Sequence, residues 1–291
     1  MKPKDTFFSR KSMINCRGKL IHLTEQKVMG ILNVTPDSFY DGGKYTVDDQ
    51  IKKKVEQMVN EGVDIIDIGG YSSRPGAQKI SLELELKRLT KALLIVRSLY
   101  PDGIVSVDTF RSKVAKTVVK DFEVDIINDI SAGNLDSNMF QTIAELRVPY
   151  IIMHMQGTPE NMQKHPEYKD MIPEIFCFFS SKIESLKRMG VKDIIIDPGF
   201  GFGKTVDHNY ELLYRLDEFK IFGTPILIGV SRKSMIYKYL EITPDESLNG
   251  TSVLHTLSIL NGADILRAHD VKEAKQCIKL VNKYKSVSKY L

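Results

Sequence analysis

Eight short apolar segments recur along the chain, and a polar residue stands at or near the end of each one. They cover residues 28–33, 64–68, 104–107, 126–130, 150–155, 193–197, 226–231 and 263–267. The polar residues at these ends are Asn33, Asp67, Asp108, Asn128, His154, Asp197, Ser231 and Arg267. Continuous runs of Val, Ile and Leu are typical of parallel strands buried on both faces. Most runs precede a loop and a segment of helical periodicity, so the sequence predicts an α/β fold, the (β/α)8 or TIM barrel with eight parallel strands.

Helix signals alternate with these strands. Thr46, followed by Asp49, predicts a helix that continues to Glu61, and Ser81 predicts the cap of a helix over 82–99. Further helices are predicted at 111–121, 138–146, 170–189, 208–218, 233–240, 247–261 and 271–288. The turn signal Arg17-Gly18-Lys19 predicts a short N-terminal hairpin that closes the lower end of the barrel. We therefore expect one domain over 1–291, with an extension at 1–27 and the barrel at 28–288.

Composition limits the classes of function. With 42% hydrophobic residues the chain can form a large core, and a net charge of +4 is too small to indicate a nucleic-acid partner. Cys16, Cys177 and Cys277 are far apart and form no CxxC motif, which argues against a disulfide framework or a zinc site. No apolar run reaches the ~18 residues of a membrane span. We expect a cytoplasmic protein with no membrane partner.

Active sites of (β/α)8 barrels lie at the carboxyl ends of the strands. Two loops there, 33–43 and 69–77, are rich in Gly, Pro, Ser and Asp, and they carry Asn33, Asp37, Asp41, Ser73 and Arg74. We interpret them as lids over the mouth of the barrel. The alternative is that they are ordinary turns, which also contain Gly and Pro.

The segment from Asp197 to Thr205 resembles two nucleotide-binding motifs and matches neither. Pro198 stands where a P-loop needs its first glycine, and the glycines are spaced as GxGxG rather than GxGxxG. The segment offers Phe202 as a wall for a flat ligand, and Asp197 as an acceptor for paired N–H donors. The alternative role of Asp197 is to cap the turn that follows.

Asp108, Asn128 and Asp129 end two neighbouring strands, and we expect them to converge inside the barrel, where a polar heterocycle would satisfy their hydrogen bonds. A network with Thr109, Arg111 or water is the competing interpretation.

Basic residues follow the last two strands, in Ser231-Arg232-Lys233-Ser234 and in Arg267-Ala268-His269. Because phosphate sites in this fold commonly use the loops after strands seven and eight, these residues predict an anion site. His154, which lies between two methionines, fits a core position and a site position equally well.

Together, the segments GILNVTPDSFYDGG, DIGGYSSRPGA, SVDTF, NDISAG, MHMQGTP, DPGFGFGKT, GVSRKS and LRAHDV resemble the dihydropteroate synthase family. This family belongs to the folate pathway and is inhibited by sulfonamides. The resemblance covers about residues 28–270. It implies that 6-hydroxymethyl-7,8-dihydropterin pyrophosphate condenses with p-aminobenzoate to give 7,8-dihydropteroate and pyrophosphate, in a dissociative displacement. It also implies Mg²⁺ as cofactor and a homodimer.

The resemblance assigns roles residue by residue. The catalytic residues would be Asp108, Lys233, Arg267 and His269. The pterin would contact Asp108, Asn128, Met153, Asp197 and Lys233. The pyrophosphate would contact Asn33, Ser73, Arg74, Arg267 and His269, with the metal near Asn33. The p-aminobenzoate site would consist of Phe39, Ser73, Pro75, Phe202, Lys233 and Ser234.

The second loop departs from the family pattern. Many members have Glu-Ser-Thr-Arg-Pro where this chain has Tyr71-Ser72-Ser73-Arg74-Pro75. Ser73 keeps the hydroxyl group, but Tyr71 replaces a carboxylate with a phenol. Loop closure and contacts with p-aminobenzoate or sulfonamides can therefore differ from those of the family.

Three other functions share parts of this pattern. A pterin-binding methyltransferase would need no pyrophosphate site, and the basic residues Arg74, Lys233, Arg267 and His269 argue against it. A non-catalytic pterin-binding paralogue would retain Asp108 and Asn128 while losing anion or loop residues, and this chain retains both sets. A barrel that acts on sugar phosphates is the alternative at the level of the fold, but it has no use for the glycine-rich wall with Phe202.

Overall fold

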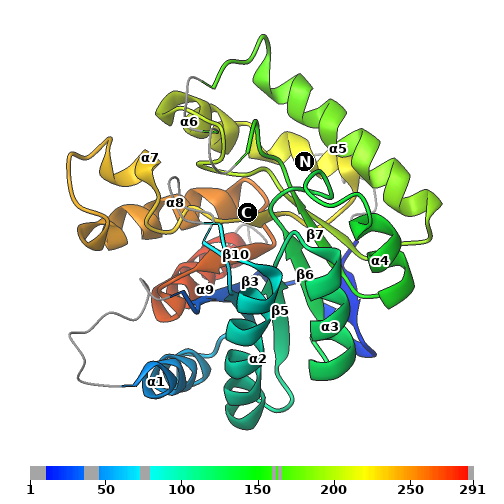
Figure 1. Ribbon diagram of the computed structural model, residues 1–291. Helices are drawn as coiled ribbons and strands as arrows, with labels where there is room; N and C mark the ends of the chain where they lie inside the picture. Colours follow the sequence, from blue (N-terminus) through cyan, green and yellow to red (C-terminus); the bar gives the residue numbers. More distant parts are fainter. Residues whose placement is uncertain (1–10, 36–45, 73–78, 159–161, 163–165, 288–291) are drawn as a thin grey trace.

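In a computed structural model of the protein, eight parallel strands form a ring that helices surround (Figure 1). The structure describes residues 11–35, 46–72, 79–158, 162 and 166–287. The barrel strands are β3 (Lys27–Asn33), β4 (Ile65–Gly69), β5 (Ile104–Asp108), β6 (Ile126–Asp129), β7 (Tyr150–Met153), β8 (Ile194–Asp197), β9 (Leu227–Ile228) and β10 (Ile265–Ala268). Their order is β8-β7-β6-β5-β4-β3-β10-β9, and a parallel bridge between Ile196 and Ile226 joins the two ends of the sheet. The predicted (β/α)8 barrel is confirmed.

The helices alternate with the strands as the sequence predicts. They are α1 (Val47–Asn60), α2 (Leu82–Leu99), α3 (Ser112–Phe122), α4 (Met139–Leu146), α5 (Met171–Arg188), α6 (Val206–Tyr214), α7 (Ser234–Tyr237), α8 (Leu248–Leu260) and α9 (Val271–Val287). The side chains of Thr46 and Ser81 accept hydrogen bonds from the third residue beyond each of them, so both predicted caps are confirmed. The segment predicted as one helix over 208–218 is instead α6 followed by the 3-10 helix η2 (Leu216–Phe222).

The segment around the seventh barrel strand is shorter than predicted. The run 226–231 yields only the two residues of β9, and the helix predicted over 233–240 yields only the four residues of α7. Arg232 has a φ of 55°, so the chain turns sharply after the strand. A second left-handed residue, Glu241, lies in the turn that follows α7. The left-handed backbone of these residues gives no signal in the apolar pattern.

A hairpin of β1 (Met13–Cys16) and β2 (Lys19–His22) closes one end of the barrel. Its turn residues Arg17 and Gly18 both have positive φ, which matches the twist of a two-residue hairpin. Ile14, Cys16, Ile21 and Leu23 join a buried cluster with one residue from each barrel strand. The strand residues are Met29, Ile65, Ile104, Ile126, Ile151, Ile195, Leu227 and Ile265. The predicted hairpin therefore fills the amino-terminal end of the barrel with apolar side chains.

Aspartates at the starts of alternate strands reinforce the same end. Asp64, Asp125 and Asp264 directly precede β4, β6 and β10. Their carboxylates accept the backbone N–H groups of Val28, Val105 and Ile226 at 2.7, 2.9 and 2.7 Å, respectively. Each bond satisfies a buried backbone donor in, or directly before, the preceding strand. The lower end of the barrel is thus fixed by hydrogen bonds as well as by packing.

We predict that the hairpin stabilises the whole barrel. Ile14 is fully buried, so Ile14→Ala should lower the free energy of unfolding by about 2–4 kcal/mol through lost burial and the remaining cavity. Leu20 lies in the same hairpin and is 57% exposed, so Leu20→Ala should change it by less than about 1 kcal/mol. Urea denaturation of both variants measures the difference. Equal losses would show that the hairpin is not part of the cooperative core.

Candidate active site

The interior of the barrel becomes polar two residues further along each strand than the buried apolar cluster that the hairpin completes. Side chains two residues apart in a strand point to the same face. The next inward positions are therefore Ile31, Asp67, Ser106, Asn128, Met153, Asp197, Gly229 and Arg267. Of the side chains in this layer, Asp67 and Ser106 are fully buried, and Asn128, Met153 and Asp197 are at most 6% exposed. The layer forms the floor of a site at the carboxyl ends of the strands.

Arg267 is the centre of this floor. Its Nε donates to Asp67 Oδ2 at 2.7 Å, and its Nη2 donates to Asp108 Oδ2 at 3.1 Å. Asn128 Nδ2 donates to the same Asp67 oxygen at 3.1 Å. Four side chains from β4, β5, β6 and β10 thus form one connected network. The other carboxylate oxygen of Asp67 and the hydroxyl of Ser106 are buried without a partner, so the floor retains unused hydrogen-bonding capacity.

Burial changes the acid–base properties of the floor. It raises the pKa of Asp108 to about 7, while the Arg267 guanidinium opposes that rise and Asp67, Asp129 and Glu85 add to it. Burial likewise raises the pKa of Asp197, against the opposing charges of Lys233, Arg267 and Lys204. Burial therefore disfavours the ionised form of both carboxylates, and the surrounding cations oppose that effect.

Lys233 is the cation that interacts most strongly with Asp197. Burial lowers the pKa of Lys233 to about 8, and Asp197 opposes that change. Its Nζ donates a hydrogen bond to the carbonyl oxygen of Phe200 and lies 4.7 Å from the centre of the Phe202 ring. Gly199 N donates to Asp197 Oδ1 at 2.8 Å. The carboxylate of Asp197 thus accepts a hydrogen bond from the turn that follows it, as the alternative interpretation predicted. Its second oxygen, Oδ2, is left for another donor.

The prediction that Asp129 faces into the barrel is wrong. Asp129 follows Asn128 in β6, so strand alternation points its side chain to the opposite face. There it accepts hydrogen bonds from the Tyr150 hydroxyl at 2.6 Å and from Ser131 Oγ at 2.7 Å. Asp129 therefore stabilises the layer between strands and helices.

The competing network through Thr109 and Arg111 is also not formed by Asp108. Thr109 Oγ1 and Arg111 Nη1 donate instead to the fully buried carboxylate of Glu85, at 2.7 and 2.6 Å. Arg111 also lies 5.6 Å from the centre of the Tyr71 ring, and that ring packs edge-on against Phe110. Tyr71 is thus held by an aromatic and cationic cluster at the start of the second loop.

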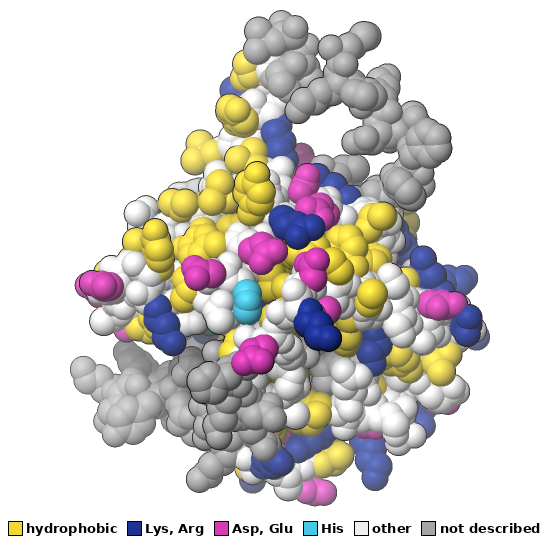
Figure 2. Space-filling view, turned by 90° about the horizontal axis from the view of Figure 1, so that it is seen from above, with side chains coloured by type: hydrophobic (Ala, Val, Ile, Leu, Met, Phe, Trp, Pro, Cys, Tyr) yellow, Lys and Arg dark blue, Asp and Glu magenta, His cyan; other side chains and the backbone are white. Residues whose placement is uncertain are grey.

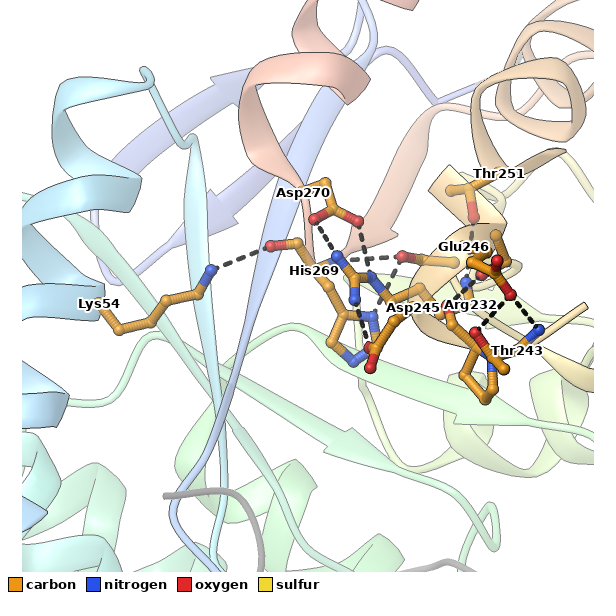
Figure 3. Close-up of polar contacts among 11 residues, drawn as sticks. Lys54, Arg232, Thr243, Asp245, Glu246, Thr251, His269 and Asp270 are labelled. Atoms are coloured by element: carbon orange, nitrogen blue, oxygen red, sulfur yellow. Dashed lines mark hydrogen bonds and ion pairs between the residues drawn. The ribbon is translucent and has the colours of Figure 1, made fainter. Parts of the chain in front are cut away.

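The turns after β9 and β10 are joined by an ion pair (Figure 3). Arg232 donates from Nε and Nη2 to the two oxygens of Asp270, at 3.0 and 2.8 Å, and from Nη1 to Asp245 at 3.2 Å. Two carboxylates therefore compensate the charge of Arg232, a pairing that the sequence did not predict. The ion pair between Arg232 and Asp270 fixes the position of the two turns that carry Lys233 and His269.

His269, directly after β10, is fixed by contacts with two other segments of the chain. Its Nδ1 lies 3.1 Å from Ser231 Oγ, and Lys54 from α1 donates to its carbonyl oxygen at 3.2 Å (Figure 3). Burial lowers the pKa of His269 to about 4, and the charge of Arg267 lowers it further. The imidazole is therefore neutral at pH 7 and can offer a hydrogen bond, but no charge, to an anion.

Asn33 and Asp108 flank Gly69 at the mouth, because these residues are paired across β3, β4 and β5. A Cβ atom at Gly69 would lie 3.0 Å from Asn33 Oδ1, so the missing side chain leaves space for that oxygen. Ser234 begins α7 beside Lys233. The predicted site residues Phe39, Ser73, Arg74 and Pro75, and the loop residues Asp37 and Asp41, lie outside the described residues.

Asp67 was not assigned a role from the sequence, although it ends one of the eight apolar runs. Strand alternation contains the missing signal, because Asp67 stands two residues after Ile65, which points into the barrel. Applying the same offset to Ile126 and Ile265 gives Asn128 and Arg267, the two residues that hydrogen-bond with Asp67.

The outer surface carries no uniform charge on the face drawn in Figure 2, where acidic, basic and hydrophobic side chains are interspersed. Within the described ranges, no helix is both long and apolar enough to cross a bilayer. The same residues contain no cluster of three or more His, Cys, Asp or Glu side chains arranged to hold a metal ion.

Known proteins share this chain's sequence and architecture. The sequence profile of the family described as "Pterin binding enzyme" matches residues 29–269. The dihydropteroate synthase of Escherichia coli K12 is 40% identical over 267 residues, which is 91% of this chain and 94% of that protein. The dihydropteroate synthase of Synechocystis is 41% identical over 258 residues, covering 88% of this chain and 89% of that protein.

Solved structures agree with these relatives. The Yersinia pestis dihydropteroate synthase in a sulfonamide drug complex has a TM-score of 0.88 at 38% identity, covering 94% of this chain and 99% of that one. The Xanthomonas albilineans dihydropteroate synthase with 4-aminobenzoic acid also has a TM-score of 0.88, at 34% identity, covering 94% and 98% of the two chains. The chain therefore belongs to the pterin-binding enzyme family and, within it, to the dihydropteroate synthases of folate synthesis.

Proposed function

We propose that the polar floor binds the pterin ring of 6-hydroxymethyl-7,8-dihydropterin pyrophosphate, which the enzyme condenses with p-aminobenzoate. The observation that carries this proposal is the network in which Arg267 joins Asp67, Asn128 and Asp108. A flat ring with several donors and acceptors would use the free carboxylate and amide positions around it. The proposed pterin contacts are Asp108, Asn128, Met153, Asp197 and Lys233, to which the structure adds Asp67 as a neighbour.

The proposed pyrophosphate contacts are Asn33, Ser73, Arg74, Arg267 and His269. The structure of the floor supports this role for Arg267, because one of its guanidinium nitrogens, Nη1, is in neither ion pair. His269 would contribute a hydrogen bond from a neutral imidazole. As the bond between the pterin methylene carbon and the pyrophosphate oxygen breaks, its electron pair leaves with the pyrophosphate, and these groups would stabilise the added charge.

The proposed p-aminobenzoate contacts are Phe39, Ser73, Pro75, Phe202, Lys233 and Ser234. The ring of Phe202 beside Lys233 supports this assignment, since it combines an apolar face with a cation suited to a carboxylate. In the proposed dissociative order, pyrophosphate leaves first and the carboxylates of Asp108 and Asp197 stabilise the pterin cation. The amino nitrogen then forms the new C–N bond and loses one proton.

We further propose that Mg²⁺ binds near Asn33 together with pyrophosphate. Mg²⁺ in proteins is commonly held by one or two side-chain oxygens, water and substrate phosphates. Asn33 Oδ1, which the absence of a side chain at Gly69 accommodates, would supply one such oxygen, and the substrate phosphates would supply others. When bound, the metal would neutralise charge on the leaving group.

We also propose a homodimer that works in the cytoplasm. Val253, Leu257 and Leu260 in α8, and Leu280 and Tyr284 in α9, are 41–72% exposed. They recur at intervals of three or four residues, so each helix presents an apolar stripe, and the two helices pack together. Light scattering should give a mass twice that of the 33.1 kDa chain, and the mass of a single chain would contradict the dimer.

The proposed reaction is tested by product formation. Purified protein given the pterin pyrophosphate, p-aminobenzoate and Mg²⁺ should form dihydropteroate and release pyrophosphate in equal amounts. Omission of either substrate should abolish product, and chelation of the metal should greatly slow pyrophosphate release. Pterin binding without any product in the complete mixture would instead favour a methyltransferase or a non-catalytic binding protein.

The pH dependence of the enzyme should report Asp108 and Lys233. In the free enzyme, Asp108 becomes ionised as pH rises through about 7, and Lys233 loses its charge above about 8. If both charges are needed, kcat/KM should rise through the first value and fall through the second, as a narrow bell.

Asp108→Asn is the matched variant, since the amide cannot ionise. It should reduce kcat/KM by about 100-fold or more and remove the acid limb of the bell while leaving the basic limb. Retention of the same acid limb in Asp108→Asn would assign that limb to another group.

A further inference from the structure

A lysine lies buried behind the glycine-rich loop 199–203, and the roles proposed above do not use it. Lys204 is 4% exposed, and its Nζ lies 3.0 Å from the carbonyl oxygen of Gly199, 3.2 Å from that of Phe202 and 3.0 Å from Nδ1 of His154. An ammonium group has three N–H donors and no acceptor. Each donor of Lys204 therefore has one acceptor, and two of the three acceptors belong to the loop.

His154 is suited to be the third acceptor. Burial lowers its pKa to about 2, and the charge of Lys204 lowers it further, so the imidazole is neutral. Burial lowers the pKa of Lys204 itself to about 7, and the charge of Asp197 opposes that change. When Lys204 is protonated, its ammonium group can only donate, so Nδ1 then carries the lone pair and Nε2 the proton. The ring also packs against Phe178 and Tyr168. His154 is thus a fixed acceptor in the core and not a ligand that faces the mouth.

The backbone of the loop 199–203 packs closely against the backbone of the segment that follows β7. Gly199 and Gly203 have φ values of 77° and 61°. A Cβ atom at Gly199 would lie 1.9 Å from the carbonyl oxygen of His154, and one at Gly203 would lie 2.6 Å from that of Gln156. Such left-handed, glycine-dependent backbone has many alternatives in the free chain. Because Lys204 donates hydrogen bonds to both Gly199 and Phe202, it favours one conformation of the loop 199–203.

That shape places three groups of the proposed site. Gly199 N–H donates to Asp197 at 2.8 Å, the carbonyl oxygen of Phe200 accepts from Lys233, and the Phe202 ring lies beside the Lys233 ammonium. The charge of Lys204 also lowers the pKa of Asp197, after the larger effects of Lys233, Gly199 and Arg267. Lys204 is thus linked to both substrate subsites through the loop it holds.

We propose that Lys204 is a positioning residue of the synthase: with His154 as its acceptor, it holds the loop 199–203 in the shape that orients Asp197, Lys233 and Phe202. It does not touch substrate. The inference rests on the proposed assignment of those three residues to the pterin and p-aminobenzoate subsites. It differs from a purely structural role because it predicts a change in substrate binding per folded molecule.

The test compares Lys204→Met with Lys187→Met, the same substitution at an exposed position on α5. The dissociation constant of the pterin pyrophosphate is measured by calorimetry, and the KM of p-aminobenzoate by product formation, on protein shown to be folded by circular dichroism. Lys204→Met should raise both constants by about tenfold or more, as displacement of a positioned group does. Lys187→Met should leave them within about twofold. A lower melting temperature or smaller active fraction of Lys204→Met, with both constants unchanged, would overturn the proposal.

A second pair keeps the test decisive if Lys204→Met does not fold. His154→Asn keeps an acceptor oxygen near the position of Nδ1, whereas His154→Phe keeps a ring without an acceptor. The proposal predicts that His154→Phe raises the KM of p-aminobenzoate and that His154→Asn restores it toward the parent value. Equal KM values for the two variants would overturn the proposal.

Asp197→Asn separates this inference from the proposed subsites. If Asp197→Asn weakens pterin binding while Lys204→Met binds as the parent does, the subsite assignment stands and the positioning role fails. If Asp197→Asn binds pterin as tightly as the parent, the subsite assignment fails first.

Discussion

The ion pair of Arg267 with Asp67 and Asp108 is the constraint on which the proposed site depends. A guanidinium and two carboxylates are costly to bury unless they pair with good geometry. Here Arg267 reaches one carboxylate on each of two strands, and Asn128 supplies a further donor to Asp67. Removing any one member would leave a buried charge or acceptor unpaired. The network therefore fixes the orientation of the groups that face the ligand, in addition to balancing charge.

The barrel can hold this polar layer because its other end is closed. The hairpin fills the amino-terminal end with Ile14 and Ile21, and aspartates such as Asp125 accept N–H groups near the starts of the strands. The carboxyl ends are left for function, which is the usual division in this fold. Around the mouth, the ion pair between Arg232 and Asp270 joins the turns that carry Lys233 and His269.

The sequence predicted the barrel well, because each strand is a continuous apolar run and Thr46 and Ser81 are clear helix caps. It did not predict how short β9 and α7 are, because the left-handed turn residue Arg232, which separates them, leaves no apolar signal. Of the residues predicted for the site, Asp108, Asn128 and Arg267 lie in one network, and its connections through Asp67 were not predicted. Asp129 was misplaced, since a one-residue offset in a strand reverses the direction of a side chain.

Residues that act through others were the hardest to predict. Strand alternation places Asp67 inside the barrel, but its partners Asn128 and Arg267 come from strands distant in sequence. Asp245 and Asp270 likewise approach Arg232 only in the fold. Pairwise contacts of this kind depend on register and turn geometry, which composition and periodicity do not contain.

A double-mutant cycle between Asp67 and Arg267 tests most directly whether the ion pair organises the site. The measured quantity is kcat/KM for Asp67→Asn, Arg267→Met and the double variant, each checked for folding. If the two side chains act as one unit, the double variant should lose little more than the worse single variant, with a coupling energy of about 1–3 kcal/mol. Losses that simply add would contradict the account, because they would show that the two residues contribute independently.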